Sequence, residues 1–352
     1  MNHPALSLLS LTLLSSSAWA VDNGAPVDWS QQDNTVRLDN STNAQKYCTA
    51  TLVAGRYALT AAHCLDSEGL DTLINANGDT VAFTQMLMHP NFVEDGSFSG
   101  EDIAIVTLDN PLDYSSIQFL NIDNRVVGEP ITIAGFGGTI ESLNSVELTF
   151  SHYHNYNHFA LYADVVEEES HTTGGDSGAA WLNQDNDIMA IHKGSIVVNG
   201  SDGKFRETYG TDIQAVQGFL TENIDAWHYP TLAEVNGRTT ITVQSLHQSG
   251  ITNTAYTQGN ITLINEDSTC VTEGLIAPFE QCTYVIEGSS GEEGQLFLSD
   301  SEVIHINKPV EDVDPEDPDD NTGGGGSSSG GSLGLGSLLF AGLLAWRRKR
   351  SY

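Results

Sequence analysis

The chain has 352 residues, enough for two domains of ordinary size with further segments at its ends. Its 47 Asp and Glu residues outnumber 13 Lys and Arg residues, which gives a formal net charge of −34. Because a polyanion repels nucleic acid, this charge excludes nucleic acid as an expected partner and indicates a solvated acidic surface.

The first twenty residues have the pattern of a secretory signal peptide. A short apolar run covers Ala5 to Leu14, and Ala18-Trp-Ala20 forms a small-x-small cleavage site. The run has no polar face, which disfavours a short core helix, although no Lys or Arg precedes it. We therefore expect residues 1–20 to be a signal peptide and the mature protein to be exported.

Four cysteines form two pairs that are close in sequence, Cys48 with Cys64 and Cys270 with Cys282. In an oxidising compartment this is the natural pairing, and each disulfide closes a short loop. A zinc site is the alternative, but no Cys-x-x-Cys pair or paired-His motif accompanies these cysteines. We expect no metal site.

Residues 21–228 show short apolar segments separated by Gly, Asn and Asp, a pattern typical of an all-β barrel or sandwich. The clearest predicted strands are Ala50–Val53, Ile103–Leu108, Ile131–Ala134 and Ile188–Ile191. Over Ile213–Trp227 the apolar residues recur at helical spacing instead, which predicts one amphipathic helix packed on the β structure.

A second β pattern covers residues 229–307, with predicted strands at Thr239–Val243, Ile261–Ile264 and Gln295–Leu298. Its length suits a small β-sandwich held by Cys270–Cys282. No cluster of chemically reactive residues occurs in it. We expect a spacer or a module that positions substrate, with an adhesin as the alternative.

The composition changes after residue 307. Residues 308–332 contain the acidic run Glu311–Asp320 and then an almost pure Gly and Ser stretch, neither of which can bury a core. The acidic run also lacks the spaced ligands of a calcium loop. Residues 333–352 hold an apolar segment, barely long enough to cross a bilayer, and the basic end Arg347-Arg-Lys-Arg350, which is expected to stay in the cytoplasm.

This tail resembles the GlyGly-CTERM sorting signal of exported Gram-negative proteins, in which a Gly/Ser motif, a short apolar helix and a basic terminus follow one another. The resemblance implies a sorting protease as a partner and membrane contact through the tail only. It also implies a location at the cell surface or outside the cell of a Gram-negative bacterium.

Three short motifs with candidate catalytic residues occur in the order His, Asp, Ser. They are Thr60-Ala-Ala-His-Cys64, Glu101-Asp-Ile-Ala-Ile105 and Gly174-Gly-Asp-Ser-Gly178. Each motif alone has a structural explanation, as a buried His, a strand cap or a turn. The order excludes the α/β-hydrolase arrangement, in which Ser comes first.

Taken together, the motifs match the requirements of nucleophilic catalysis. The hydroxyl of Ser177 needs a base to take its proton, His63 supplies that base, and the carboxylate of Asp102 fixes the tautomer of the base. Glycines beside the serine allow the backbone N–H groups of Gly175 and Ser177 to approach a developing oxyanion. The sequence therefore predicts a hydrolase with an acyl-enzyme on Ser177.

With these motifs in register, residues 21–228 resemble the chymotrypsin (trypsin-like) serine protease family. Ala134-Gly-Phe-Gly137 is similar to the family's Gly-Trp-Gly turn, and Cys48 is placed to make its histidine-loop disulfide. The resemblance implies an all-β fold of two six-stranded antiparallel β-barrels, here followed by the small β-sandwich. It implies a secreted serine endopeptidase that acts on proteins or peptides and needs no cofactor.

In that family His63 would act as general base and then as general acid to the leaving amine, while Asp102 orients His63. A non-catalytic surface binding protein on a protease fold is the competing class. Cleavage after Ala20 would expose Val21-Asp-Asn-Gly24, which resembles the family's mature start of Ile-Val-Gly-Gly apart from its second residue. The family inserts this amine beside the residue at Asp176, so we expect signal peptidase to create the active N-terminus.

The specificity pocket departs from trypsin. The sixth residue before the nucleophile is His171, so a preference for Lys or Arg lacks its carboxylate. Thr172-Thr-Gly-Gly175 and Ile191-His-Lys-Gly194 resemble the bacterial glutamyl endopeptidases, with Lys193 in place of a Trp. The resemblance implies that Thr172 and His192 bind a substrate carboxylate, to which His171 could add a donor. We predict Glu before the cut, with trypsin-like or broad specificity as alternatives.

Overall fold

The computed structural model describes residues 21, 23–66, 68–93, 100–154, 159–166, 170–200 and 203–309. They belong to a compact unit that ends at Pro309. The predicted signal peptide and almost all of the predicted linker and tail lie outside the described residues. In the part of the chain that the structure describes, no helix is long and apolar enough to span a bilayer.

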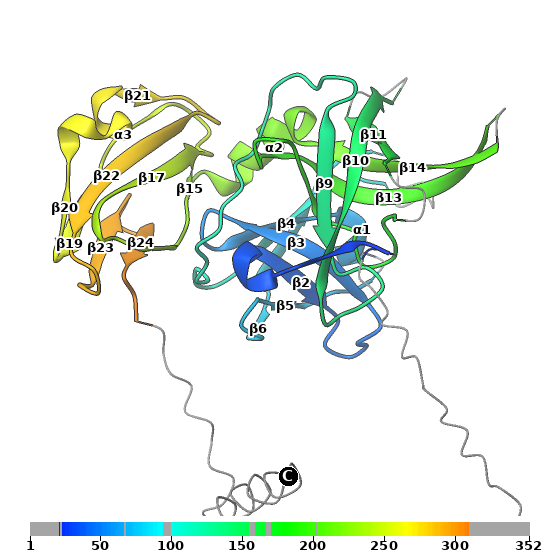
Figure 1. The fold of residues 1–352 in the computed structure, drawn as a ribbon, viewed down its shortest axis with the longest axis horizontal. Helices are drawn as coiled ribbons and strands as arrows, with labels where there is room; N and C mark the ends of the chain where they lie inside the picture. The colour runs from blue at the N-terminus through cyan, green and yellow to red at the C-terminus, as the bar shows by residue number, and fades with distance from the viewer. Residues whose placement is uncertain are drawn as a thin grey trace, which may run out of the picture. The chain divides into compact units, whose positions relative to one another are not determined.

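Seven antiparallel strands of the first half of the chain form a curled sheet in the order β6-β5-β2-β3-β4-β8-β7. Figure 1 labels β2 to β6 of this sheet. The strands of this sheet are β2 (Thr35–Asp39), β3 (Tyr47–Val53), β4 (Tyr57–Thr60), β5 (Thr72–Ile74), β6 (Thr80–Ala82), β7 (Gln85–Met88) and β8 (Ala104–Thr107). The sheet curls round a core that includes Leu38, Leu52 and Val106. Among the described strands no pairing joins β6 to β7, so this sheet stays open.

A second sheet closes on itself. Its order is β1-β10-β11-β14-β13-β12-β9, and a further pairing of β9 with β10 makes a barrel of six strands to which β1 is added. The strands are β1 (Ala25–Val27), β9 (Pro130–Gly135), β10 (Leu143–Tyr153), β11 (Ala160–Val165), β12 (Ala180–Leu182), β13 (Ile188–Gly200) and β14 (Gly203–Asp212).

The second sheet closes round an apolar core because its strands alternate in polarity. In β10 the side chains of Val146, Leu148 and Phe150 are buried, while Glu147 and Thr149 between them are not. The buried set packs with Trp181 in one cluster. The predicted all-β fold of chymotrypsin type is therefore confirmed, with one closed barrel and one curled sheet.

The described helices are short and lie at the ends of strands. The α1 helix (Ala62–Asp66) follows β4, the 3-10 helix η1 (Trp29–Gln32) follows β1, and α2 (Ile213–Ile224) follows β14. The side chain of Asp212 caps α2 by accepting from the N–H of Gln214.

The helix predicted over Ile213–Trp227 is real but ends earlier. Asp225 has a left-handed backbone (φ 45°), which stops α2 at Ile224. Trp227 belongs instead to β15 (Trp227–His228), where its ring is buried in a different core.

Two four-stranded sheets around that core form a small sandwich, in the orders β15-β17-β22-β20 and β16-β24-β23-β19. The remaining elements are β16 (Leu232–Ala233), β17 (Gly237–Ser245), β18 (Ile251–Thr252), β19 (Tyr256–Gly259), β20 (Ile261–Leu263), η2 (Asn265–Asp267), α3 (Thr269–Thr272), β21 (Leu275–Ile276), β22 (Gln281–Gly288), β23 (Gly294–Phe297) and β24 (Val303–Ile306). The predicted Cys270–Cys282 disulfide is confirmed and joins α3 to β22.

Buried polar side chains tie the sandwich to the preceding sheets. Nδ1 of His228 accepts from the N–H of Ala54 (3.1 Å), and its Nε2 lies 2.9 Å from the carbonyl oxygen of Gln118. The side-chain amide of Gln244 both donates to and accepts from the backbone of Leu120, at 2.8 and 2.9 Å. These pairings satisfy polar groups that would otherwise be buried without partners.

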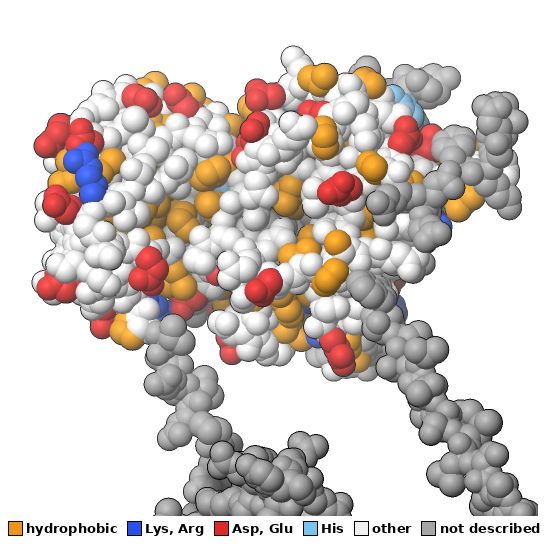
Figure 2. Space-filling view, in the orientation of Figure 1, with side chains coloured by type: hydrophobic (Ala, Val, Ile, Leu, Met, Phe, Trp, Pro, Cys, Tyr) orange, Lys and Arg blue, Asp and Glu red, His pale blue; other side chains and the backbone are white. Residues whose placement is uncertain are grey.

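The surface agrees with the composition. Figure 2 shows red acidic side chains spread over the visible face, with few blue Lys and Arg side chains between them. A surface of this kind favours solubility and gives no positive patch for nucleic acid on that face.

Candidate active site

The pairing of β4 with β8 brings His63 and Asp102 together. Thr60 is opposite Ala104 in this antiparallel pair, so the residues just after β4 meet those just before β8. The imidazole Nδ1 of His63 lies 2.7 Å from Oδ2 of Asp102, and the backbone N–H of His63 donates to Oδ1 at 3.0 Å. With Nδ1 as the donor to this carboxylate, Nε2 is left as an acceptor that can take a proton.

Asp102 is fully buried, which keeps water from competing for its oxygens. Thr211, at the end of β14, donates its hydroxyl to the backbone carbonyl of Asp102 at 3.0 Å. The second barrel thus helps to fix a residue of the first sheet. No local sequence pattern marks Thr211, because its role depends on a contact between residues 109 positions apart.

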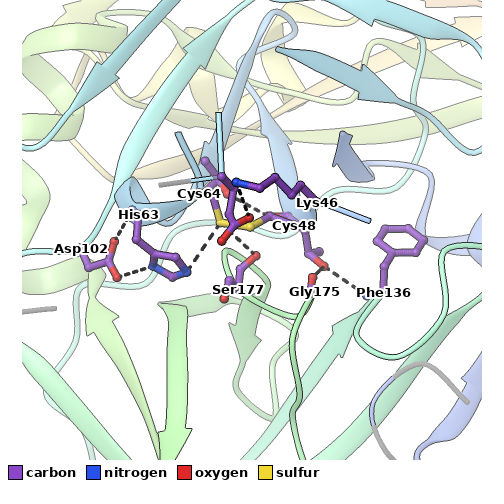
Figure 3. The surroundings of a disulfide bond; sticks show 11 residues. Lys46, Cys48, His63, Cys64, Asp102, Phe136, Gly175 and Ser177 are labelled. Carbon is purple, nitrogen blue, oxygen red and sulfur yellow. Dashed lines mark hydrogen bonds and ion pairs between the residues drawn. A yellow bond between two sulfur atoms is a disulfide. The ribbon is translucent and has the colours of Figure 1, made fainter. Parts of the chain in front are cut away.

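The disulfide Cys48–Cys64 lies directly beside His63 (Figure 3). Sγ of Cys64 is 3.9 Å from Nε2 of His63 and 3.8 Å from the carbonyl oxygen of Ser177, so both residues meet at this sulfur. The predicted disulfide is confirmed. Because both sulfurs are bonded to each other, neither cysteine is a thiolate that could hold zinc.

The loop that carries Ser177 is anchored to β3. The N–H of Thr49 donates to the carbonyl oxygen of Ser177 at 2.8 Å, and its hydroxyl donates to the carbonyl oxygen of Gly175 at 2.9 Å. Gly178 has φ +85°, and a Cβ there would lie 2.1 Å from Oγ1 of Thr60. Only glycine fits where the Ser177 loop comes this close to Thr60 of β4.

The same loop exposes backbone donors. Gly175 has φ +105°, and Ser177 is only partly buried. Within the residues that the structure describes, the N–H groups of Gly175 and Ser177 donate no hydrogen bond. Two unused N–H groups beside a serine provide the donors that an oxyanion would need.

The side chain of Asp176 is fully buried, and its carboxylate lies against Gly135 and Gly137. Its carboxylate accepts from the N–H of Gly137 and from the N–H of Thr173, each at 2.8 Å. Burial nevertheless raises the pKa of Asp176 to about 7. Among the described residues no Lys, Arg or His forms an ion pair with the carboxylate of Asp176. The side chain of Val21 is buried in the core of the second barrel.

The predicted pocket residues Thr172 and His192 are both buried, with 1% of each exposed. Nε1 of Trp181 donates to Nδ1 of His192 at 3.3 Å, so the proton of the neutral ring is on Nε2. Burial, helped by the nearby His63, lowers the pKa of His192 to about 3. His192 is therefore a neutral donor, and Trp181, which the sequence did not single out, fixes its tautomer.

His171 and Lys193, which flank Thr172 and His192 in the sequence, differ in their burial. His171 is partly exposed. Lys193 is buried, and its ammonium donates to the carbonyl oxygen of Gly100 at 3.1 Å and lies 5.6 Å from the ring centroid of Phe159. The side chain that replaces the family's Trp thus points to the segment just before Asp102.

A closed β-barrel and a curled β-sheet that bring a His–Asp pair beside a Gly-Asp-Ser-Gly loop define the scaffold of a chymotrypsin-type serine protease. The sequence model for trypsin matches residues 21–220. The chain therefore belongs to the trypsin family.

Known relatives share parts of this chain. It is 28% identical over 161 residues to a trypsin of Saccharopolyspora erythraea, which covers 39% of this chain and 70% of the trypsin. It is 35% identical over 92 residues to an ovochymase of Halocynthia roretzi, a match that spans 23% of this chain and only 6% of the ovochymase.

Solved structures of similar fold include mouse neuropsin, a serine protease, with a TM-score of 0.49 and 18% identity over 58% of this chain and 99% of neuropsin. The Vibrio cholerae VesB protease has a TM-score of 0.46 and 18% identity, covering 81% of this chain and 98% of VesB.

Proposed function

We propose that this protein is an exported serine endopeptidase whose triad is His63, Asp102 and Ser177. The observation that carries the proposal is the 2.7 Å contact between His63 and the buried Asp102, next to a serine on a loop with unused N–H donors. Membership of the trypsin family and two disulfides support proteolysis in an oxidising compartment.

In the proposed reaction, Oγ of Ser177 attacks the scissile carbonyl carbon while Nε2 of His63 takes the hydroxyl proton. The N–H groups of Gly175 and Ser177 bind the oxyanion, and Asp102 stabilises the imidazolium. His63 then gives its proton to the leaving amine. Water hydrolyses the acyl-enzyme by the same steps, again with His63 as base.

The proposal is tested with Ser177→Ala and with a serine-reactive phosphonate. The wild type should hydrolyse peptides and become labelled, whereas Ser177→Ala should fold and do neither. Ser289→Ala, in the sandwich, is the matched control and should keep both properties. Full activity of Ser177→Ala would refute the triad, and a wild type that neither cleaves nor reacts would favour a non-catalytic binding protein.

The mature N-terminus is proposed to be Val21, which signal peptidase would create. A buried carboxylate whose pKa is raised to about 7 is costly to ionise, so a new α-amine beside Asp176 would stabilise its charged form. N-terminal sequencing of the active enzyme should give Val21. A start well beyond Val21 would exclude this route.

The preferred residue before the cut is proposed to be Glu. Support comes from His192, whose Nε2–H is a donor held by Trp181, and from Oγ1 of Thr172, which is buried with no hydrogen-bond partner in the described structure. A substrate carboxylate would satisfy both groups. Peptides that differ only at this residue (Glu, Lys, Phe) should be cleaved best with Glu; equal or better cleavage after Lys would refute the preference.

The sandwich is proposed to position substrate, since its buried contacts through His228 and Gln244 fix it to the preceding sheets. Delivery by the C-terminal tail to the Gram-negative cell surface, with a sorting protease as partner, is proposed from the tail's composition alone. Mass spectrometry of the mature protein tests it, because the sorted form should end near the Gly/Ser stretch.

A further inference from the structure

Arg206 is linked through Ser195 to the backbone of Thr172, a residue of the proposed specificity pocket. Nη1 of Arg206, on β14, donates to Oγ of Ser195 at 3.1 Å. Oγ of Ser195, on the neighbouring β13, lies 3.3 Å from the carbonyl oxygen of Thr172 and donates to it. Arg206 is therefore two hydrogen bonds away from a residue proposed to bind substrate.

Of the five arginines among the described residues, Arg56 and Arg206 form no ion pair with an Asp or Glu there. Three other arginines, Arg37, Arg125 and Arg238, each form an ion pair with an Asp. In the described ranges Arg206 pairs with no Asp or Glu, although acidic residues outnumber basic ones by 47 to 13. A guanidinium has five N–H donors, and the contact with Ser195 uses one of them.

Unpartnered hydroxyls mark the same place. Thr208 is directly opposite Ser195 in the β13–β14 pair. The Oγ1 atoms of Thr208 and Thr172 are both buried without a hydrogen-bond partner among the described residues. Buried polar atoms without partners are rare in folded proteins, so these two hydroxyls leave hydrogen-bonding capacity unused near Ser195.

A carboxylate in this pocket needs a positive charge that His192 does not supply. His192 is buried and neutral, so it offers one hydrogen bond from Nε2. Taking a carboxylate out of water is costly unless a cation accompanies it. Arg206 carries a permanent charge and matches the planar geometry of a carboxylate.

We propose that Arg206 is a specificity residue of the primary pocket, where its guanidinium binds the carboxylate of an acidic side chain before the cut. Ser195 holds the guanidinium at the pocket wall in the free enzyme. The inference rests on the proposed serine endopeptidase and on its preference for Glu, and it adds the source of the charge.

The test measures kcat/KM of the processed wild-type protein and its variants on peptides that carry Glu or Gln before the cut. Arg206→Gln should lower the Glu/Gln ratio of kcat/KM about tenfold, because the charge-assisted contact with the Glu carboxylate is lost. Arg206→Lys should keep part of the ratio. Arg238→Gln, on the sandwich, is the control and should keep all of it.

Each failure is distinguishable. A wild type that cleaves neither peptide overturns the endopeptidase function, and one that cleaves both equally overturns the acid preference; either result also overturns the role of Arg206. A wild type that prefers Glu, with the same ratio in Arg206→Gln, overturns the role of Arg206 alone. If Arg206→Gln does not fold, as judged by its thermal midpoint, Arg206→Lys decides, and a Glu/Gln ratio of Arg206→Lys equal to that of the wild type overturns the proposal.

Discussion

The buried ring of His228 is expected to make the stability of the protein fall as the pH is lowered below about 6.5. Its Nδ1 accepts from the N–H of Ala54, so its proton is on Nε2 and faces the carbonyl oxygen of Gln118. Protonation of Nδ1 would break the first bond. Burial lowers the pKa of His228 to about 4, whereas an unfolded His has its ordinary value of about 6.5.

The sign follows from these two values. Between pH 6.5 and pH 4 the unfolded chain binds this proton and the folded chain does not, so stability falls as the pH is lowered. The contribution of His228 is complete above about pH 6.5. By pH 4.5, about 2.5 kcal/mol of it should be lost, from two pH units at about 1.4 kcal/mol each with partial titration of the folded state.

The perturbation that isolates this effect is His228→Gln. A glutamine amide can replace the donor to Gln118 but leaves the N–H of Ala54 buried without an acceptor, which costs about 1–3 kcal/mol. At pH 7.5 the variant should therefore be less stable than the wild type by about that amount. At pH 4.5 the difference should vanish or change sign, because only the wild type pays for the protonation of His228.

Urea unfolding of both proteins, followed by tryptophan fluorescence at pH 7.5 and pH 4.5, measures the two differences. The other buried histidines titrate equally in both proteins and cancel. His305→Gln, at a partly buried position of the sandwich, is the control and should show no such pH-dependent difference. An equal stability difference at the two pH values would refute the reasoning.

Three further outcomes are expected. Asp102→Asn should fold normally but lose about 10³–10⁴ in kcat on a peptide substrate, because the imidazole loses its tautomer and its charge partner. Gly178→Ala should unfold at a clearly lower temperature in a calorimetric scan, since its new Cβ would lie 2.1 Å from Oγ1 of Thr60. Trp181→Phe removes the donor to His192 and should lower the Glu/Gln ratio of kcat/KM about fivefold, the equivalent of one hydrogen bond of about 1 kcal/mol.

Much of this protein could be predicted from local sequence. Short apolar segments separated by Gly, Asn and Asp marked the strands, and the spacing of apolar residues marked the helix that begins at Ile213. The two disulfides followed from the proximity of their cysteines. The residues of the proposed triad stood in short motifs because each needs a particular backbone beside it, as the glycine at Gly178 illustrates.

Other features depended on pairing between distant strands. The end of α2 was misplaced because Trp227 continues the apolar spacing of the helix but is buried in the core of the sandwich, beyond the left-handed backbone at Asp225 that ends the helix. The sequence pattern marked strands of the first sheet but not which strands pair, and among the described strands no pairing joins β6 to β7.

The charge and protonation of the residues in the proposed pocket likewise depend on tertiary structure. The tautomer of His192 depends on Trp181, eleven residues away, and the position of Arg206 depends on its contact with Ser195 across two strands. Sequence determines which chemical groups the chain has to offer. Only folding determines which of them lose water and which neighbours they meet, and these two factors set whether a buried group acts as a donor, a base or a charge.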